Sequence, residues 1–342
     1  MSTHTSTEMS SQMSNQITQL PSETLHMSEL TIQLSDPVTE LLKAAKRPNT
    51  LRAYRSDWQA FTNWCADNSL QSLPASPQCV SAYIAAKQGQ LSVATVQRHI
   101  ASISTAHKTA GHNSPTAHEL VRTTMQGLRA LGNQVGKRAG RKGKAPALTA
   151  EHMRKVIDAI PYDYAGVRDI AVLLIGYKAA LRRSEIASIC WENIDMQVEG
   201  MVLNLQGTKT DSEYAGQRVA VAYESGKYCA VQAIMRYATL CNSQGIGTEQ
   251  GAVFRNINKH MQLGESLTAA SVGAIVTARC AEIGLDGMTD HSLRRGHLTE
   301  GHKQGRNEAD LMRTSRHKSV QVFRGYIDDA DLFGRATGKG LL

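Results

Sequence analysis

The chain has 342 residues, of which 41% are hydrophobic, and a formal net charge of +8. This length exceeds one typical domain and suffices for two domains with a tail, and the hydrophobic fraction allows most of the chain to bury a core. Five acidic residues precede the first basic residue, Lys43, so residues 43–342 carry the larger net charge of +13. Such an excess favours a polyanionic partner.

The six cysteines, at positions 65, 79, 190, 229, 241 and 280, are scattered and form no CxxC pair. This spacing argues against a zinc site and against a disulfide framework, and favours a reducing compartment. No basic segment followed by an apolar stretch opens the chain, so a secretory signal is not expected. The longest apolar run, near residues 170–175, is too short to span a membrane. We therefore expect a soluble protein of the cytoplasm.

Residues 1–36 are rich in Ser, Thr, Gln and Met and show no sustained hydrophobic period, which predicts a disordered tail. Residues 37–135 are predicted to form a small all-helical domain. Ser76-Pro77, Ser92 and Ser114-Pro115 each indicate a helix start, because Ser is a preferred N-cap and Pro fits the first helical position. The apolar residues that recur at steps of three or four, and so share one face of the first helix, are Leu51, Tyr54, Trp58, Phe61 and Trp64.

Residues 136–147 are predicted to be a basic linker. Five cations with glycines between them cannot bury a core, so the segment is expected to be exposed. Two interpretations stay open, a solvated charge run or contact with phosphates. The cations are Lys137, Arg138, Arg141, Lys142 and Lys144.

Residues 148–342 are predicted to form a mainly helical domain with a small antiparallel sheet, which makes the expected fold class mostly α. Thr149 can cap the first helix, and residues 167–180 form a long apolar helical stretch. Residues 194–196 and 201–205, on either side of a Glu199-Gly200 turn, are typical of a hairpin, and residues 218–223 alternate like a third strand. The remainder, up to Tyr326, is predicted to be helical.

Four short segments of this domain combine strong cations, imidazoles and a phenol without a carboxylate cluster. Taken alone, each has an ordinary explanation, such as a surface arginine or a lysine in a polar loop. They are ALRRSE with Arg182, GTKT with Lys209, HSLRR with His291 and Arg294, and SRHKSVQVFRGY with His317 and Tyr326.

Together these segments resemble the tyrosine recombinase (phage integrase) family, and within it the Cre-like simple recombinases. The order Arg, Lys, His-x-x-Arg, His, Tyr is the catalytic order of that family, and the resemblance covers nearly all of residues 48–330. It includes NTLRAYRSDWQAFTNWC in the first domain and VRDIAVLLIGYKAALRRSEIASI in the second. One position departs from the pattern: Arg316 stands where the family often has Gly, and either contacts a phosphate or points to solvent.

The resemblance implies a DNA strand-exchange enzyme in which Tyr326 attacks a phosphodiester, forms a 3′-phosphotyrosine and frees a 5′-hydroxyl. Arg182 and Arg294 are the implied phosphate clamps. The chemistry agrees, because cleavage without a metal ion needs fixed positive charge around the non-bridging oxygens, and a guanidinium matches phosphate in a bidentate way. Geometry alone does not select Arg182 over Arg183 or Arg294 over Arg295; the family pattern does.

A phenol with a pKa of about 10 needs help to lose its proton. His291 is the implied base, and it lies three residues before Arg294, so that on a helix both project from one face. Lys209 is the implied acid for the leaving 5′-oxygen, His317 the implied hydrogen-bond donor to the phosphate, and Glu185 a residue that orients its neighbours. The bond energy stays in the phosphotyrosine, so no metal, ATP or other cofactor is expected.

The implied partner is double-stranded DNA with an inverted-repeat site, bound by a homotetramer that joins two sites through a Holliday junction. The helices that follow Ser92 and Thr268 are candidates for the major groove, with Gln97, Arg98 and Arg279 as base readers. Residues from about 327 to 342 are expected to dock on a neighbouring subunit.

Three alternatives stay open. A type IB topoisomerase shares the phosphotyrosine chemistry, but the separate capped-helix domain argues against it. A telomere-resolving enzyme shares the site and typically has further domains. A DNA-binding protein that has lost catalysis would lack an active residue, and none is missing here.

Overall fold

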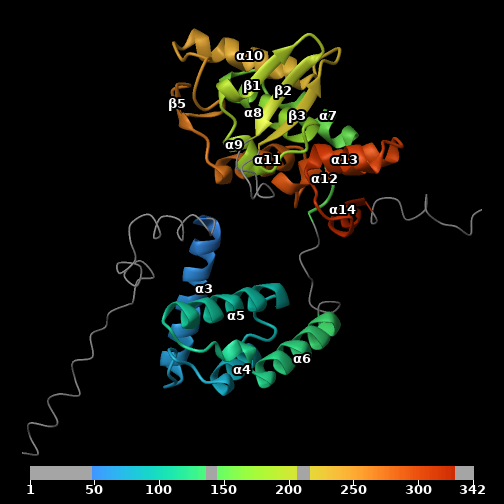
Figure 1. Cartoon of the computed structure of the whole chain (residues 1–342). Coiled ribbons are helices and arrows are strands. Elements are labelled where there is room, and N and C mark those ends of the chain that lie inside the picture. Colours follow the sequence, from blue (N-terminus) through green and yellow to red (C-terminus); the bar gives the residue numbers. More distant parts are fainter. Residues whose placement is uncertain (1–47, 136–144, 206–215, 328–342) are drawn as a thin grey trace, which may run out of the picture. The chain divides into compact units, whose positions relative to one another are not determined.

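The computed structural model describes residues 48–135, 145–205 and 216–327. The chain divides into two compact units, Met1–Arg141 and Lys142–Leu342, called here the N-terminal and C-terminal units (Figure 1). Each unit has its own apolar core. In the described ranges, no helix is both long and apolar enough to cross a membrane.

The N-terminal unit is all-helical over residues 48–135. The hydroxyls of Ser76 and Ser92 accept hydrogen bonds from backbone N–H groups three residues further on, so both predicted N-caps are confirmed. Its elements are α3 (Pro48–Asp67), α4 (Pro77–Ala86), α5 (Val93–Thr109), the 3₁₀ helix η1 (Pro115–Ala117) and α6 (Glu119–Val135).

The helix start predicted at Ser114-Pro115 was wrong in part. This pair opens only η1, and the long helix α6 begins at Glu119. The Ser114 hydroxyl makes no capping hydrogen bond to the backbone, because it bonds the hydroxyls of Ser104 and Thr116 instead.

The C-terminal unit is mainly helical, with two small antiparallel sheets. Thr149 caps its first helix as predicted, since its hydroxyl accepts from the backbone N–H of His152. The elements are α7 (Ala150–Ala159), α8 (Tyr164–Lys178), α9 (Arg183–Ala187), the 3₁₀ helix η2 (Trp191–Asn193), β1 (Ile194–Gln197), β2 (Gly200–Leu205), β3 (Gln217–Ala222), α10 (Ala230–Ser243), β4 (Arg255–Ile257), β5 (Leu263–Ser266), α11 (Ala269–Ala281), α12 (Asp290–Lys303), α13 (Glu308–Ser315) and α14 (Val320–Ile327).

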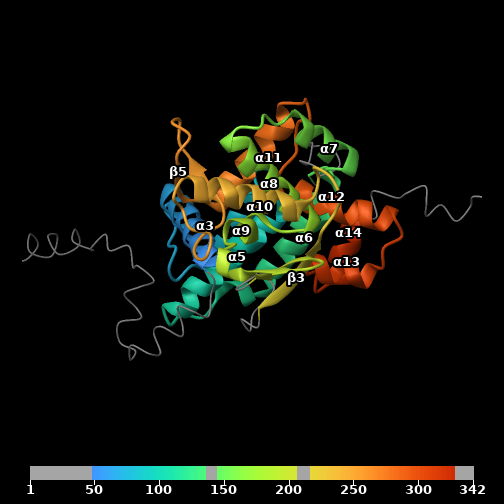
Figure 2. The same cartoon turned by 90° about the horizontal axis from the view of Figure 1, so that it is seen from above.

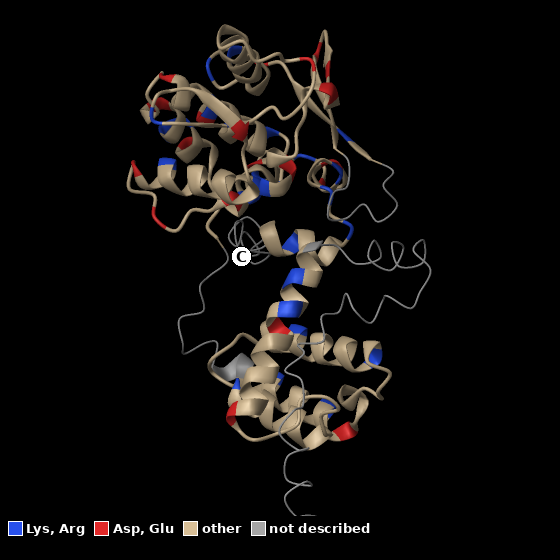
Figure 3. Ribbon diagram, turned by 90° about the vertical axis from the view of Figure 1, so that its left-hand side faces the viewer, with Lys and Arg blue, Asp and Glu red and all other residues tan. Residues whose placement is uncertain are grey.

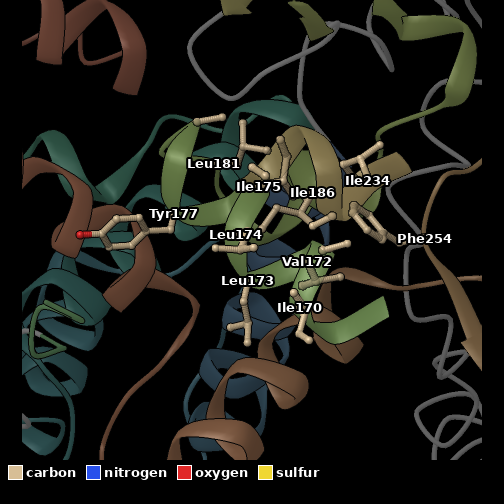
Figure 4. Packing of buried hydrophobic residues seen from close by; sticks show 14 of the residues in the cluster. Ile170, Val172, Leu173, Leu174, Ile175, Tyr177, Leu181, Ile186, Ile234 and Phe254 are labelled. Carbon is tan, nitrogen blue, oxygen red and sulfur yellow. The ribbon is translucent and has the colours of Figure 1, made fainter. Parts of the chain in front are cut away.

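Helix α8 is the centre of the C-terminal unit. Its residues from 168 to 177 are all buried, and a helix that is apolar on every side must be enclosed by other elements. Figure 4 shows its side chains packed among Ile186 of α9, Ile234 of α10 and Phe254. The end of α8 therefore lies at a fixed place, just before the segment that carries Arg182.

The larger sheet has the strand order β1-β2-β3, with both pairs antiparallel, so the predicted hairpin and third strand are confirmed. The prediction that everything after residue 227 is helical was wrong, because β4 and β5 form a second, two-stranded sheet. Those strands have three and four residues, which is too short for an alternating pattern to be recognised.

Helices α12, α13 and α14 gather on one side of the C-terminal unit, with β3 next to α13, in both Figure 1 and Figure 2. A small cluster of buried apolar side chains, Leu298, Leu311, Phe323 and Ile327, joins the three helices, and Tyr326 packs against it. The last described helix is thereby anchored to α12, which carries the HSLRR segment.

Candidate active site

Arg182 lies at the N-terminus of α9 and is held by Glu185, three residues further on. The carboxylate of Glu185 accepts the backbone N–H of Arg182 at 2.8 Å and its guanidinium at 2.6 Å. Glu185 is buried. Burial alone would raise its pKa, but the charges of Arg316 and Arg182 outweigh burial and hold the pKa of Glu185 below its ordinary value. The carboxylate is therefore ionised and fixes the orientation of Arg182.

Arg294 of α12 is 1% exposed and reaches the same region from another helix. Its guanidinium donates to the carbonyl oxygen of Ala180 at 2.7 Å and to that of Ser315. Burial, and after it the charges of Arg182 and Arg316, lower the pKa of Arg294 to about 9. The side chain remains charged at neutral pH.

His317 follows α13 and contacts both Arg294 and Tyr326. Its Nδ1 lies 2.8 Å from the Ser315 hydroxyl, which donates its own proton to the carbonyl of Leu311. Nδ1 therefore carries the ring proton, and Nε2, 3.4 Å from the Arg294 guanidinium, is an acceptor. Burial, and then the charges of Arg294 and Arg182, lower the pKa of His317 to about 3, so the ring is neutral.

Tyr326 of α14 completes the site, with its ring centroid 5.0 Å from that of His317. It also lines a cavity of about 460 Å³ together with His291 and Arg295. The His291 side chain is 61% exposed, whereas Arg294 on the same helix is buried, so the two residues lie at different depths. The structure thus brings the predicted nucleophile and the predicted base to one cavity.

A second cavity, of about 310 Å³, opens beside His317 and is rich in basic residues. Lys209 lies outside the described residues, and Gln217, which begins β3, lines this cavity. The lining residues are Gln217, Arg218, Met312, Arg313, Arg316, His317 and Lys318.

Arg316 does not point to solvent, so one of the two interpretations that its sequence position left open is wrong, and the contact with a phosphate stays a prediction. The residue is 5% exposed, and its guanidinium pairs with Glu185 at 2.6 Å. A buried position requires a partner for the charge, and the partner lies 131 residues away in the sequence. Sequence reasoning could have noticed only that a charged side chain replaces the small residue of the family pattern.

The predicted base readers differ in their exposure and in their ion pairs with other side chains of the protein. Gln97 and Arg98 are exposed on α5, and the Arg98 guanidinium binds the buried Asp57 with both its Nε and an Nη atom. Arg279 of α11 pairs with Asp169 and Glu282 and is largely covered, an arrangement that favours a structural role. The five linker cations lie outside the described residues.

The arrangement is suited to binding an anion. Three arginines, Arg182, Arg294 and Arg316, surround one carboxylate, so the cluster has an excess of positive charge. Elsewhere on the C-terminal unit acidic and basic residues are interspersed (Figure 3). Fixed, poorly solvated positive charge of this kind stabilises the negative charge that develops on a reacting phosphate.

Family models match segments of both units, and known proteins match much of the chain. Residues 146–332 match the model of the phage integrase family, and residues 39–112 match that of the phage integrase N-terminal SAM-like domain. The chain is 30% identical to an integrase/recombinase xerD homolog from Selenomonas ruminantium, over 88% of this chain and 87% of that protein. It is 26% identical to the recombinase cre of Escherichia phage P1, over 51% of each.

The fold is that of solved integrases. A structure of the Tn1549 transposon integrase with transposon right end DNA has a TM-score of 0.57 at 14% identity, covering 82% of this chain and 90% of that one. A lambda integrase tetramer bound to a Holliday junction has a TM-score of 0.55 at 15% identity, covering 84% and 73%. The chain belongs to the phage integrase family, the tyrosine recombinases, whose members cleave and rejoin DNA at specific sites.

Proposed function

We propose that this chain is a site-specific DNA recombinase that cleaves and rejoins strands through a 3′-phosphotyrosine at Tyr326. One observation carries the proposal: three separate segments of the C-terminal unit converge on Arg294. Arg182 comes from the start of α9, His317 from the end of α13, and Tyr326 from α14 with its ring against His317. The same residues stand in the catalytic order of the family.

In the proposed reaction, Arg182 and Arg294 hold the non-bridging oxygens of the scissile phosphate while Tyr326 attacks the phosphorus. His291, which shares a cavity with Tyr326, takes the phenolic proton, and Lys209 protonates the leaving 5′-oxygen. Glu185 orients Arg182 through its ion pair. The phosphotyrosine conserves the energy of the broken bond, so rejoining requires neither ATP nor a metal ion.

The role of His317 needs one further step. In the DNA-free site its Nδ1–H donates a hydrogen bond to the Ser315 hydroxyl, and its Nε2 lies beside the Arg294 guanidinium. To donate a hydrogen bond to a phosphate, Nε2 must carry a proton, either through a tautomeric shift from Nδ1 or through uptake of a second proton. The negative charge of an incoming phosphate favours that uptake, because an opposite charge nearby stabilises the imidazolium form.

The proposed partner is double-stranded DNA with an inverted-repeat site, on which four subunits join two sites and pass through a Holliday junction. The solved complexes of lambda integrase, a tetramer on a Holliday junction, and of the Tn1549 integrase with transposon end DNA support this by similarity of fold. Gln97 and Arg98 on the exposed face of α5 are the proposed base readers, and the linker cations the proposed phosphate contacts.

The test is recombination between two copies of a bound site. DNA fragments that flank the gene are selected by binding to the protein, and a plasmid with two copies is incubated with the protein in EDTA without ATP. We expect deletion or inversion products with the unaltered protein and none with Tyr326→Phe. Strong, specific binding without any product would favour the DNA-binding alternative, and relaxation of supercoiled DNA without the site would favour a topoisomerase.

A further inference from the structure

Arg316 occupies an unusual backbone position for a residue with a long side chain. It is the C-cap of α13, with φ 56° and ψ 43°, a left-handed conformation that glycine adopts at lower cost. Its side chain is nevertheless 2% exposed. An arginine at a position that disfavours it sterically, and buried in addition, points to a function of the guanidinium.

The guanidinium of Arg316 is fixed by contacts with the end of α8 and with α9. One terminal nitrogen donates to Glu185 Oε2 at 2.6 Å and to the carbonyl of Ala180 at 2.9 Å. The other lies 3.3 Å from the carbonyl of Ala179 and also donates to Thr314. Among the described residues its buried Nε has no hydrogen-bond partner, so Glu185 and the carbonyl groups are bound by the terminal nitrogens alone.

Glu185 connects Arg316 to Arg182. Its Oε2 accepts from Arg316 and from the backbone N–H of Arg182, while its Oε1 accepts from the Arg182 guanidinium at 2.6 Å. Because Glu185 is 4% exposed, water has little access to the carboxylate and cannot easily replace a lost partner. The rotation of the carboxylate, and with it the direction of Arg182, therefore depends on Arg316.

We propose that Arg316 is a positioning residue, which holds one oxygen of Glu185 so that the other directs the Arg182 guanidinium toward the scissile phosphate. The inference rests on the proposed function, since it assigns Arg316 to the same phosphate site. Arg182, Glu185 and Arg316 then act as one unit. Loss of the contact between Arg316 and Glu185 disorders the contact between Glu185 and Arg182, and the reverse.

The experiment compares substitutions at Arg316, at Glu185 and at a control arginine with the unaltered full-length protein. Arg316→Gly removes the guanidinium and suits the left-handed backbone, so the fold is retained, and Arg316→Lys restores one charged contact. Arg306→Ala is the matched control, because Arg306 lies just before α13, is exposed and is not among the residues that line either cavity of the site. The measurements are the single-turnover rate of covalent complex formation at saturating protein, the Kd for the DNA fragment and the melting temperature.

We expect Arg316→Gly to lower the cleavage rate about 10²-fold, with the Kd within about 3-fold of the original, as for loss of one preorganised electrostatic contact. Arg316→Lys should recover part of the rate, and Arg306→Ala should cleave normally. Glu185→Gln in the Arg316→Gly background should add little, because the two residues act as one unit. An unchanged cleavage rate in Arg316→Gly, or fully additive losses, would overturn the inference.

A second measurement does not depend on activity. In the DNA-free protein, NMR relaxation of the Arg182 Nε–H reports how firmly its guanidinium is held. We expect an ordered signal that becomes mobile in Arg316→Gly and remains ordered in Arg306→Ala. If no fragment is cleaved by the unaltered protein, the proposed function fails, and this comparison alone decides the positioning role: an equally ordered Arg182 in Arg316→Gly contradicts it.

Discussion

At the scale of single residues, two buried arginines share one backbone oxygen. Ala180 has a positive φ of 47°, and its carbonyl accepts hydrogen bonds from Arg294 and Arg316. It lies just beyond the C-terminus of α8, where the helix dipole places partial negative charge. The main chain at the end of α8 therefore stabilises the positive charges of the site, in addition to the single carboxylate of Glu185.

The choice between Arg182 and Arg183, which the sequence left to the family pattern, can be tested directly. Arg182 is largely covered and held by Glu185, whereas Arg183 is 55% exposed and lies 3.6 Å from Asp290. We expect Arg182→Lys to lower the covalent cleavage rate about 10²-fold or more, because lysine cannot reproduce a bidentate contact. Arg183→Lys should cleave within about 2-fold of the original protein, and equal losses would contradict the assignment.

At the scale of elements, local sequence patterns were sufficient to predict some helices and strands and failed to predict others. The N-caps Ser76, Ser92 and Thr149 lie next to the helices they begin, so the sequence alone predicts those starts. The Ser114 cap failed because its hydroxyl finds Ser104, ten residues earlier, which a local pattern does not reveal. The strands β4 and β5 are too short to show a period.

The candidate site could be predicted only in part for the same reason. The order of its residues along the chain matches a known family, and that match supplies their roles as predictions. The environment of each residue depends on tertiary contacts: Arg316 reaches Glu185 across 131 residues, and Arg98 reaches Asp57 across 41. These contacts explain why the sequence did not reveal that Arg316 is buried against Glu185.

The position of α12 against the segment that precedes α7 depends on a glycine, Gly296, in the HSLRRG segment. A Cβ at Gly296 would lie 1.9 Å from the carbonyl oxygen of Leu148, a backbone atom that cannot turn aside. We expect Gly296→Ala to destabilise the C-terminal unit by about 2–3 kcal/mol, as overpacking does, in urea unfolding. Gly273→Ala on α11 is the matched control, because its Cβ would meet its nearest neighbour at 3.5 Å. A Gly296→Ala variant as stable as Gly273→Ala would show that α12 is not fixed here.

At the scale of the whole molecule, acid should weaken the C-terminal unit through a covered histidine. Burial, and after it the charges of Lys178 and Arg294, lower the pKa of His297 to about 4, although its hydrogen bond with the Tyr177 backbone opposes the shift. The folded pKa lies below the unfolded value of about 6.5. The stabilisation is therefore complete above pH 6.5 and is lost as the pH falls toward 4, because only the unfolded chain takes up the proton.

The pH dependence of stability measures this effect. Between pH 7 and pH 4, we expect the free energy of unfolding to fall by up to about 3 kcal/mol more in the original protein than in His297→Gln, at about 1.4 kcal/mol per pKa unit. Urea unfolding at a series of pH values gives both slopes. Parallel slopes would mean that His297 does not contribute to the acid sensitivity.

The proposed contact between the basic linker and DNA should appear in the salt dependence of binding. If the five linker cations contact phosphates, their replacement by glutamine removes up to five counterion-releasing contacts. The slope of log K against log salt concentration should then become shallower by as much as about 4.5, at about 0.9 per phosphate. Fluorescence anisotropy at several salt concentrations provides the slope, and an unchanged slope would favour a linker that is merely solvated.

The central claim is that Tyr326 becomes covalently joined to DNA, and covalent trapping tests it most directly. The protein and its Tyr326→Phe variant are mixed with labelled DNA fragments that the protein binds, and the complexes are boiled in detergent and digested for mass spectrometry. The account predicts a detergent-stable complex whose DNA-linked peptide contains Tyr326, and none with Tyr326→Phe. Specific binding by both proteins without a covalent complex, or a complex that persists in Tyr326→Phe, would contradict it.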